Sequence, residues 1–513
     1  MFTQINSAGI HGMEGFLVSV ESDVSNGLPG FSISGQLALE VREAQERVRT
    51  ALKNSDLQLP AKKITVNLSP AGMKKEGTAF DLPIAAAVLG AFELLAAEKL
   101  KDSLLIGELG LDGSVKPVRG VLVLVSAAKK MGFRRCFLPV PNMAEGALVE
   151  GIQIIGIKSL LHLQEVVSQE DFESMDQKMP VIINNRTFKS EYPFDFREIC
   201  GQNVLRRAAE VAAAGRHGLL MCGSAGTGKS MVAKRIPTIL PDLSWEENIE
   251  ISKIYSLCGL LPEGQPLLSQ RPFRSPHHTI SPQGLTGGGK VPKPGELSLA
   301  SGGVLFLDEL PHFSKGAIEA LREPLEEHRI TISRVAGSYE FPADFLILGA
   351  MNPCPCGFFP DRSRCNCTPV QIQNYLNRLS RPILERFDIC VEAAPVTFAE
   401  LEDQTTENED SAVIRSRVEK AVKIQATRFQ GTDIRNNSRM GQKEIQRFCK
   451  LKEKRFARRV YEARGISARG YHRVLKTART IADLAGEEWI QKEHLSEAFG
   501  YRALEERIWG QKH

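Results

Sequence analysis

The sequence of 513 residues lacks the features that mark membrane, secreted or repeat proteins. Its most apolar stretch, residues 82–97, contains Pro83 and Glu93 and is shorter than the roughly 20 apolar residues that a bilayer-spanning helix needs. Its first residues show no basic region followed by an apolar segment. No period of roughly 20 to 50 residues repeats along the chain. We therefore expect a cytoplasmic globular protein without a membrane partner, in which residues 82–97 form a buried helix.

Cysteine is scarce, and a strong net charge is absent. The chain has 10 cysteines, four of them clustered between residues 354 and 367, which is typical of a reducing compartment rather than of a disulfide scaffold. The 65 Lys and Arg nearly balance the 61 Asp and Glu, but their distribution is uneven. An acidic stretch, 400–410, precedes residues 411–480, which hold 20 Lys or Arg against 5 Asp or Glu. This local excess is compatible with a nucleic-acid partner, although the total of +4 decides nothing.

Hydrophobic periodicity predicts three folded regions. Residues 1–170 mix strand and helix patterns and indicate an α+β domain, and the polar residues 171–193 that follow predict a linker. Residues 194–395 alternate apolar strands with helices and predict a three-layer α/β sheet. Residues 396–513 have a helical pattern. The expected strands are 16–20, 64–68, 104–106, 219–222, 304–307 and 345–350, and the expected long helices of the first domain are 36–53 and 82–97.

The strongest chemical signal is a complete G-x-x-x-x-G-K-S motif between an apolar strand and a helical pattern. Its backbone N–H groups can converge on phosphate oxygens, Lys229 can neutralise the β and γ phosphates, and the Ser230 hydroxyl can ligate Mg²⁺. The motif predicts ATP and Mg²⁺ as ligands. The predicted nucleotide-binding residues are Gly223, Ser224, Ala225, Gly226, Thr227, Gly228, Lys229 and Ser230.

Polar residues follow two other apolar strands. Asp308 and Glu309 end the strand 304–307, where Asp308 would hold Mg²⁺ and Glu309 would polarise the attacking water. Asn352 follows the next strand and suits the orientation of that water. Arg386 is suited to reach the nucleotide of a neighbouring subunit, although an ion pair with Glu385 or Asp388 would explain it equally well.

Two groups of residues contain side chains that commonly bind metals, a cysteine cluster and a pair of histidines. Cys354, Cys356, Cys365 and Cys367 offer four thiolates for a structural Zn²⁺, although free thiols remain an alternative, because the C-x-C spacing is tighter than usual. His277 and His278 are adjacent, so we expect their side chains to diverge and not to share a metal.

The motifs GSAGTGKS, VLFLDE, GAMNPCPCG and SRPILERFD together resemble those of the ComM/YifB family of Mg-chelatase-like AAA+ ATPases, over essentially the whole chain. The resemblance implies a P-loop NTPase core with a C-terminal helical lid, in a homo-hexamer whose nucleotide sites lie between subunits. It also implies that Asn352 is the sensor 1 residue, Arg386 the arginine finger and Arg469 the sensor 2 residue. Ser224 and Ala225 replace a common Pro-Pro pair, which we expect to be harmless.

Two segments resemble pore insertions of this branch. Residues 329–341 alternate apolar and polar side chains around a turn and predict a β-hairpin with Arg334 near its tip. Residues 281–294 are too rich in Gly and Pro for a helix interior, and Lys290 lies within them. Arg334 and Lys290 are therefore the predicted DNA-binding residues; two solvated loops are the alternative.

The N-terminal region resembles the Lon-protease-like domain of chelatases. The positions that match the Lon Ser and Lys dyad are Ala79 and Leu122, which can act neither as nucleophile nor as base. A protease is therefore disfavoured. The resemblance implies an ATP-driven motor that moves on single-stranded, forked or branched DNA and promotes branch migration in natural transformation, together with recombination proteins. A chelatase-like ATPase that remodels a protein partner is the alternative.

Overall fold

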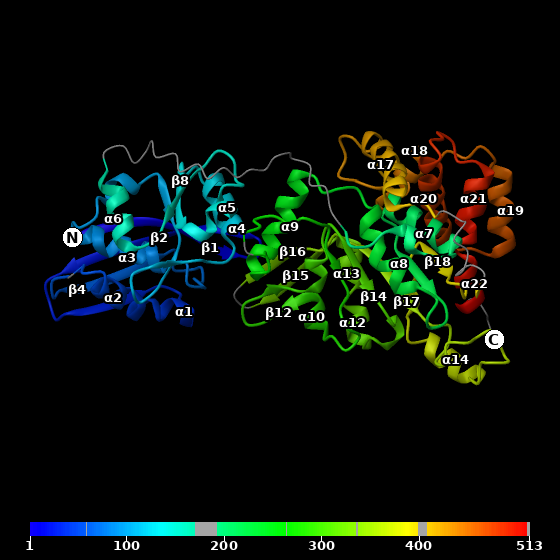
Figure 1. Cartoon of the computed structure of the whole chain (residues 1–513), viewed down its shortest axis with the longest axis horizontal. Coiled ribbons are helices and arrows are strands. Elements are labelled where there is room, and N and C mark those ends of the chain that lie inside the picture. Colours follow the sequence, from blue (N-terminus) through cyan, green and yellow to red (C-terminus); the bar gives the residue numbers. More distant parts are fainter. Residues whose placement is uncertain (58, 170–191, 263, 335–336, 399–407, 510–513) are drawn as a thin grey trace. The chain divides into compact units, whose positions relative to one another are not determined.

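The computed structural model describes residues 1–57, 59–169, 192–262, 264–334, 337–398 and 408–509 (Figure 1). The predicted linker 171–193 lies outside the described residues, apart from its last two positions. The chain forms two compact units. Unit 1 comprises Met1–Arg186, Ser244–Leu268 and Thr331–Phe341, and unit 2 comprises the other residues. Among the helices in the described ranges, none is long and apolar enough to cross a membrane.

A seven-stranded mixed sheet, ordered β3-β4-β2-β1-β5-β8-β9, organises unit 1. β1 and β2 pair antiparallel with Ile5 opposite Val20, whereas β5, β8 and β9 are parallel neighbours. The predicted strands of this region are confirmed within β2, β4 and β5. The strands are β1 (Phe2–His11), β2 (Glu14–Ser25), β3 (Gly30–Ser34), β4 (Lys63–Ser69), β5 (Ser103–Leu105), β8 (Arg135–Pro139) and β9 (Gln153–Ile157).

The helices of unit 1 bury the apolar runs of its sequence, but one of the two predicted helices ends early and the other is divided. Helix α3 (Asp81–Ala91) is buried on nearly every side, and it stops before the predicted end because Glu93 adopts a left-handed φ of 62°. The predicted helix 36–53 divides at Glu43 into α1 and α2. Besides α3, unit 1 contains α1 (Leu39–Arg42), α2 (Ala44–Asn54), α4 (Val121–Lys130), α5 (Met143–Gly146), α6 (Leu160–Ser168) and α9 (Trp245–Cys258).

Unit 2 contains a five-stranded parallel sheet, ordered β11-β14-β17-β10-β18, as the alternating pattern predicted. Its central strands are short and wholly buried, which explains why they read as continuous apolar runs in the sequence. The strands are β10 (Leu219–Cys222), β11 (Phe273–Arg274), β14 (Val304–Leu307), β17 (Leu346–Met351) and β18 (Ile389–Glu392).

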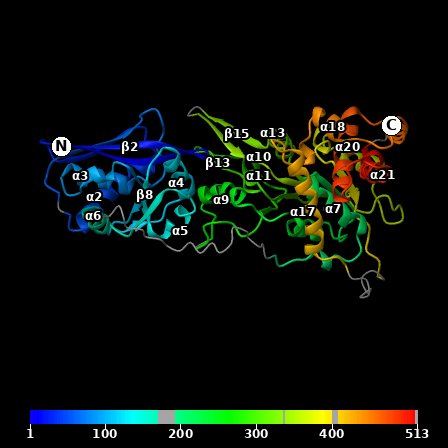
Figure 2. The same cartoon turned by 90° about the horizontal axis from the view of Figure 1, so that it is seen from above.

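The C-terminal helices pack on the sheet layer within unit 2. Figure 2 shows α17 (Ser411–Arg428) beside α7 (Asn203–Gly215), and buried side chains such as Val418 and Ala478 share one apolar core with Ala212. Unit 2 also contains α8 (Lys229–Arg235), α12 (Lys315–Glu319), α13 (Arg322–Glu327), α14 (Pro369–Leu376) and α15 (Arg381–Leu384). The remaining C-terminal helices are α18 (Gln442–Phe448), α19 (Lys454–Arg464), α20 (Ala468–Leu484), α21 (Lys492–Gly500) and α22 (Ala503–Trp509).

Part of the basic excess in residues 411–480 is neutralised inside unit 2. Arg428 donates to the buried Asp483 at 2.7 Å, and Arg479 donates to the same carboxylate at 3.1 Å. Arg417 pairs with Glu409 at 2.7 Å. Arg428 thereby joins α17 to α20, and nearby carboxylates neutralise all three arginines, so the charge count of this region overstates the positive charge that is free for a partner.

A buried ion pair joins two helices of unit 1 and generates a stability prediction. Arg47 donates to Asp81 from Nε at 2.7 Å and from Nη2 at 2.9 Å, and the Asp81 side chain is almost fully buried. We expect Arg47→Met to lower the free energy of unfolding by about 3 kcal/mol in urea titrations, because it leaves a buried carboxylate without its partner. The exposed neighbour Arg49→Met is the control and should change it by less than about 0.5 kcal/mol. Equal effects of both substitutions would contradict this role of the pair.

Candidate nucleotide and metal sites

Three adjacent parallel strands bring the predicted nucleotide residues to one edge of the sheet. The P-loop follows β10, Asp308 and Glu309 follow β14, and Asn352 follows β17, which lies between the other two. The Gly223 N–H donates to the Met351 carbonyl at 3.1 Å and so ties the start of the P-loop to the end of β17. These elements line a cavity of about 390 Å³ that includes residues 225–230, Asp308, Glu309 and Asn352.

The P-loop curls around its lysine. Gly226 and Gly228 have φ values of 81° and 82°, a region that favours glycine, which explains their place in the motif. Lys229 Nζ donates to the carbonyls of Gly223 and Ser224, each at 2.7 Å, and lies 3.4 Å from Asn352 Oδ1. Lys229 is only 8% exposed, and burial lowers its pKa. An anion in the cavity would stabilise this buried cation.

A hydroxyl and a carboxylate meet at the side of the cavity. Ser230 Oγ donates to Asp308 Oδ2 at 2.8 Å. Both are oxygen ligands of the kind that Mg²⁺ prefers, and Mg²⁺ commonly binds one or two protein ligands together with substrate phosphates. Ser230 and Asp308 could therefore hold the Mg²⁺ of a bound nucleotide.

Glu309 lies at the solvent side of the cavity beside a histidine. Its side chain is 56% exposed, and Oε2 lies 3.4 Å from Nδ1 of His278. The expectation that the side chains of His277 and His278 diverge was wrong, since their ring centroids are 4.1 Å apart. The two residues lie in a loop, where adjacent side chains need not point to opposite sides as they do in a strand. The predicted absence of a shared metal at this pair stays a prediction. His278 was not assigned to the site from sequence, because its proximity to Glu309 arises only from folding.

Two further residues escaped sequence analysis. Tyr375 of α14 is 5% exposed and lines the cavity, and burial raises its pKa to about 12. Gln202 donates to the carbonyls of Thr227, at 3.2 Å, and Ala394, which connects the residue before α7 to the P-loop. No spacing marks either residue in a single sequence.

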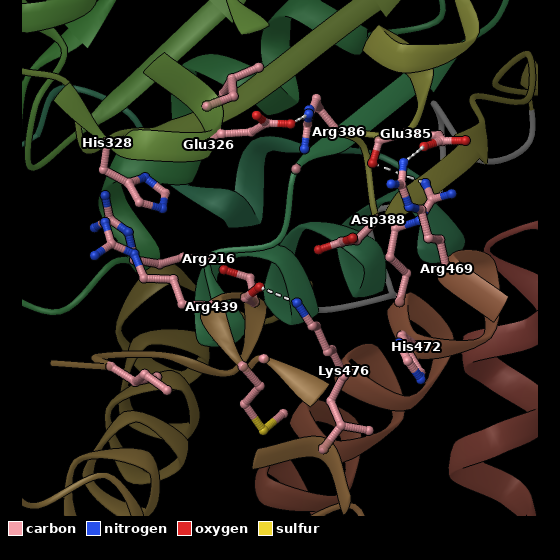
Figure 3. A pocket seen from close by; sticks show the side chains of 18 of the residues that line it. Arg216, Glu326, His328, Glu385, Arg386, Asp388, Arg439, Arg469, His472 and Lys476 are labelled. Carbon is pink, nitrogen blue, oxygen red and sulfur yellow. Dashed lines mark hydrogen bonds and ion pairs between the residues drawn. The ribbon is translucent and has the colours of Figure 1, made fainter. Parts of the chain in front are cut away.

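Arg386 and Arg469 come together in a second cavity of unit 2, of about 700 Å³ (Figure 3). Arg469 is 87% exposed and lies 3.8 Å from Glu385, while Arg473, one turn further along α20, donates to the Glu385 carbonyl at 3.1 Å. In the part of the chain that the structure describes, neither Arg386 nor Arg469 lines the phosphate cavity. The two predicted catalytic arginines are therefore near each other but do not lie in the cavity of their own P-loop.

The ion-pair partner of Arg386 differs from the alternatives that the sequence offered. Arg386 pairs with Glu326 of α13 rather than with Glu385 or Asp388 (Figure 3). Asp388 instead accepts from His217 Nδ1 at 2.8 Å. Burial, and then the nearby positive charges led by Arg322, lower the pKa of Arg386, and its Nε has no hydrogen-bond partner among the described residues. Arg386 thus retains a donor that an additional anion could satisfy.

Both predicted DNA-contacting residues lie on hairpins. Arg334 is exposed at the end of β15 (Arg329–Arg334), which pairs with β16 (Gly337–Pro342) as predicted; residues 335 and 336 of the turn lie outside the described range. Lys290 is exposed in the turn between β12 (Gly287–Gly288) and β13 (Lys293–Pro294). A short helix, α10 (Pro282–Thr286), precedes this turn and corrects the expectation of a wholly non-helical insert, because Pro282 occupies its first turn and Ser281 caps it. The α11 helix (Glu296–Leu299) follows.

The four clustered cysteines converge. The sulfur atoms of Cys354, Cys356, Cys365 and Cys367 all lie within 4.8 Å of one another, and all four thiols are free. The backbone N–H of Phe358 lowers the pKa of the Cys356 thiol to about 6. This arrangement could hold a soft metal ion.

The Lon-like positions in unit 1 are apolar, as expected. Leu122 is buried in α4, where its N–H donates to Glu145 at 2.9 Å, and Ala79 packs against the neighbouring apolar cluster. Neither side chain carries a group that could perform acyl transfer.

Comparisons with known proteins match most of the chain. The family model described as "Magnesium chelatase, subunit ChlI" matches residues 195–401, and those of "Subunit ChlI of Mg-chelatase" and "Magnesium chelatase, subunit ChlI C-terminal" match residues 20–142 and 408–502. The competence protein ComM of Haemophilus influenzae is 41% identical over 96% of this chain and 96% of its own. YifB of Escherichia coli is 40% identical over 95% of this chain and 94% of its own. An archaeal Lon protease of Methanocaldococcus jannaschii is 30% identical over 29% of this chain and 22% of its own.

The contact between Ser230 and Asp308 generates a prediction about metal dependence. We expect Mg²⁺ to raise the affinity of the parent chain for a fluorescent ATP analogue, and Asp308→Asn to lose most of that increase, because an amide is a weaker ligand than a carboxylate. Titrations of the analogue with and without Mg²⁺ measure the effect. Asp102→Asn, at an exposed position of unit 1 outside the cavity, is the control and should retain the full increase. An unchanged Mg²⁺ response in Asp308→Asn would contradict the assignment.

Proposed function

Since the chain belongs to the ComM/YifB family of Mg-chelatase-like AAA+ ATPases, we propose that it is a hexameric DNA motor that promotes branch migration in natural transformation. ATP and Mg²⁺ are its cofactors, and its partners are single-stranded, forked or branched DNA, further copies of the chain and recombination proteins. The cysteine cluster holds structural Zn²⁺. The observation that carries the ATPase part is the shared edge where the P-loop, Asp308, Glu309 and Asn352 line one cavity.

The residues of this cavity divide the work of hydrolysis. Lys229 neutralises the β and γ phosphates, and Ser230 and Asp308 hold Mg²⁺. Glu309 polarises the attacking water, and Asn352 orients it against the γ phosphate. The contact between Lys229 and Asn352, at 3.4 Å, supports this arrangement because both side chains face the same point.

The arginine cavity supports a shared site between subunits. Arg386 and Arg469 lie outside the phosphate cavity of their own chain, and Arg386 has an unsatisfied donor. In the proposed ring they reach the nucleotide of the neighbouring subunit and stabilise the negative charge of the transition state. Such arginine fingers contribute roughly 10³ to 10⁵ in rate where they act from another chain.

Two exposed basic residues and one relative support the DNA part. Arg334 and Lys290 lie on hairpins, where side chains can follow a phosphate backbone without reading its sequence. The name of the 41% identical relative connects that protein with competence. The apolar Ala79 and Leu122 support a non-proteolytic role for the N-terminal domain.

The motor function predicts DNA-dependent hydrolysis. We expect ATPase activity that forked or four-way DNA stimulates, and ATP-dependent branch migration in a gel assay. Lys229→Ala should lose nucleotide binding, whereas Glu309→Gln should bind ATP and hydrolyse it at least about 100-fold more slowly. The exposed Glu493→Gln on α21 is the matched control and should behave as the parent. ATP hydrolysis that is indifferent to DNA would contradict the motor function and favour the remodelling of a protein partner.

The shared site predicts complementation between two inactive variants. Lys229→Ala lacks the phosphate lysine and Arg386→Ala lacks the finger, so each should lose nearly all ATPase activity alone. Mixing them should restore measurable activity, because some interfaces then combine an intact P-loop with an intact finger. Mixing Lys229→Ala with a Lys229→Ala/Arg386→Ala double variant is the control and should restore none. Failure of the first mixture to recover, when mixed rings form, would contradict the role of Arg386 on the neighbouring nucleotide.

A further inference from the structure

The four cysteine sulfurs lie close enough together to bind one metal ion, since all of them are within 4.8 Å of one another. Cys354 Sγ lies 3.4 Å from that of Cys356 and 3.8 Å from that of Cys365, and Cys356 and Cys365 are 3.6 Å apart. Tetrahedral Zn²⁺ with Zn–S bonds of about 2.3 Å sets its sulfurs about 3.8 Å apart. The observed distances lie near that value and well beyond the S–S bond of about 2.05 Å in a disulfide.

The surroundings of the cluster suit its charge when Zn²⁺ is bound. Four thiolates and one Zn²⁺ carry a net charge of −2. Arg362 lies in the same loop and donates to the Cys367 carbonyl at 3.4 Å, and Arg364 stacks on Phe358. The Phe359 N–H donates to Cys354 Sγ at 3.4 Å. Such second-sphere donors and cations stabilise thiolate ligands.

The cysteine loop also contacts the P-loop directly. Ser224 Oγ donates to the Gly357 carbonyl at 2.7 Å, and Gly357 directly follows Cys356. Gly357 has a φ of 85°, and a Cβ there would lie 3.9 Å from the Ala225 nitrogen and from the Asn352 side chain. The backbone beside one zinc ligand therefore packs against both the P-loop and Asn352.

Both ends of the cysteine loop continue into the phosphate cavity. At its start, Cys354 is two residues beyond Asn352. At its end, Cys367 precedes Thr368, whose side chain caps α14 by accepting from Gln371 N at 3.2 Å. Helix α14 carries Tyr375, which lines the same cavity as Asn352. The cysteine loop therefore links the end of β17 to the start of α14, the two elements that bring Asn352 and Tyr375 to the cavity.

We propose that the Cys354–Cys367 loop binds one Zn²⁺ and that this ion braces the nucleotide site, by fixing Gly357 against Ser224 and α14 against Asn352. The bracing role rests on the proposed ATPase function, whereas the metal site does not. Zinc occupancy thereby sets how well the cavity holds a nucleotide, even though no cysteine touches it.

Metal analysis and nucleotide titration of the full chain test both parts. Inductively coupled plasma mass spectrometry of the parent should find about one Zn²⁺ per chain. Cys356→Ser and Cys367→Ser should each lose the zinc and bind a fluorescent ATP analogue about tenfold more weakly or worse. Ser224→Ala should keep the zinc and bind the analogue about fivefold more weakly, the usual effect of one hydrogen bond. Cys258→Ser, at a cysteine outside the cluster, is the control and should match the parent in both measurements.

The outcomes separate the metal site from its role. A parent without zinc, or with iron in its place, would overturn the zinc site. Zinc-free Cys356→Ser and Cys367→Ser that retain circular dichroism and full nucleotide affinity would overturn the brace. Lys229→Ala should keep its zinc while losing the nucleotide. A parent that holds zinc but binds no nucleotide would overturn the proposed function and the brace together and leave the metal site supported.

Discussion

The parallel pairing of β14, β17 and β10 is the constraint on which the rest of the nucleotide site depends. In this register Cys222 lies opposite Met351 and Leu307 opposite Gly349, so the three strands end at one edge. A slip of one residue would turn every side chain of a strand to the other face. Because both faces of each central strand are buried, the close packing of apolar side chains of different sizes, rather than an alternation of polar and apolar residues, has to hold this register. The buried apolar side chains of β10, β14 and β17 therefore position the polar residues of the cavity, although they do not themselves react.

The sequence predicted this edge well, because its signals are local. Continuous apolar runs located β10 and β14 at their observed bounds, and motif spacing located the residues that follow them. Tyr375, His278 and Gln202 were missed because their contacts with the site depend on how distant segments fold. The partner of Arg386 was missed for the same reason, since Glu326 is 60 positions away in sequence. The helix expected over 82–97 was too long, because periodicity does not report the left-handed turn at Glu93.

The number of basic residues in a segment does not show how much of their charge is available to a partner. The excess of basic residues in 411–480 suggested a surface for DNA, yet Arg428 and Arg479 share the buried Asp483. By contrast, Arg386 lies among Arg322, Arg469 and Arg473, which lower its pKa. A cluster of like charges destabilises a fold unless anions compensate it, and here Glu326 and Glu385 each lie beside one arginine of the cluster. In the proposed ring, a neighbour's triphosphate would supply further negative charge.

The cavity of the proposed nucleotide site is lined by the P-loop, a glycine-rich segment that is intrinsically flexible. A glycine-rich loop loses much conformational entropy when it is ordered, and the structure limits this cost by fastening the loop from outside. Gln202 holds it at Thr227, β17 holds it at Gly223 and the cysteine loop holds it at Ser224. The first two fastenings belong to the folded core of unit 2. The third belongs to the cysteine loop, so under the proposed zinc binding it is the contact that a metal ion can control.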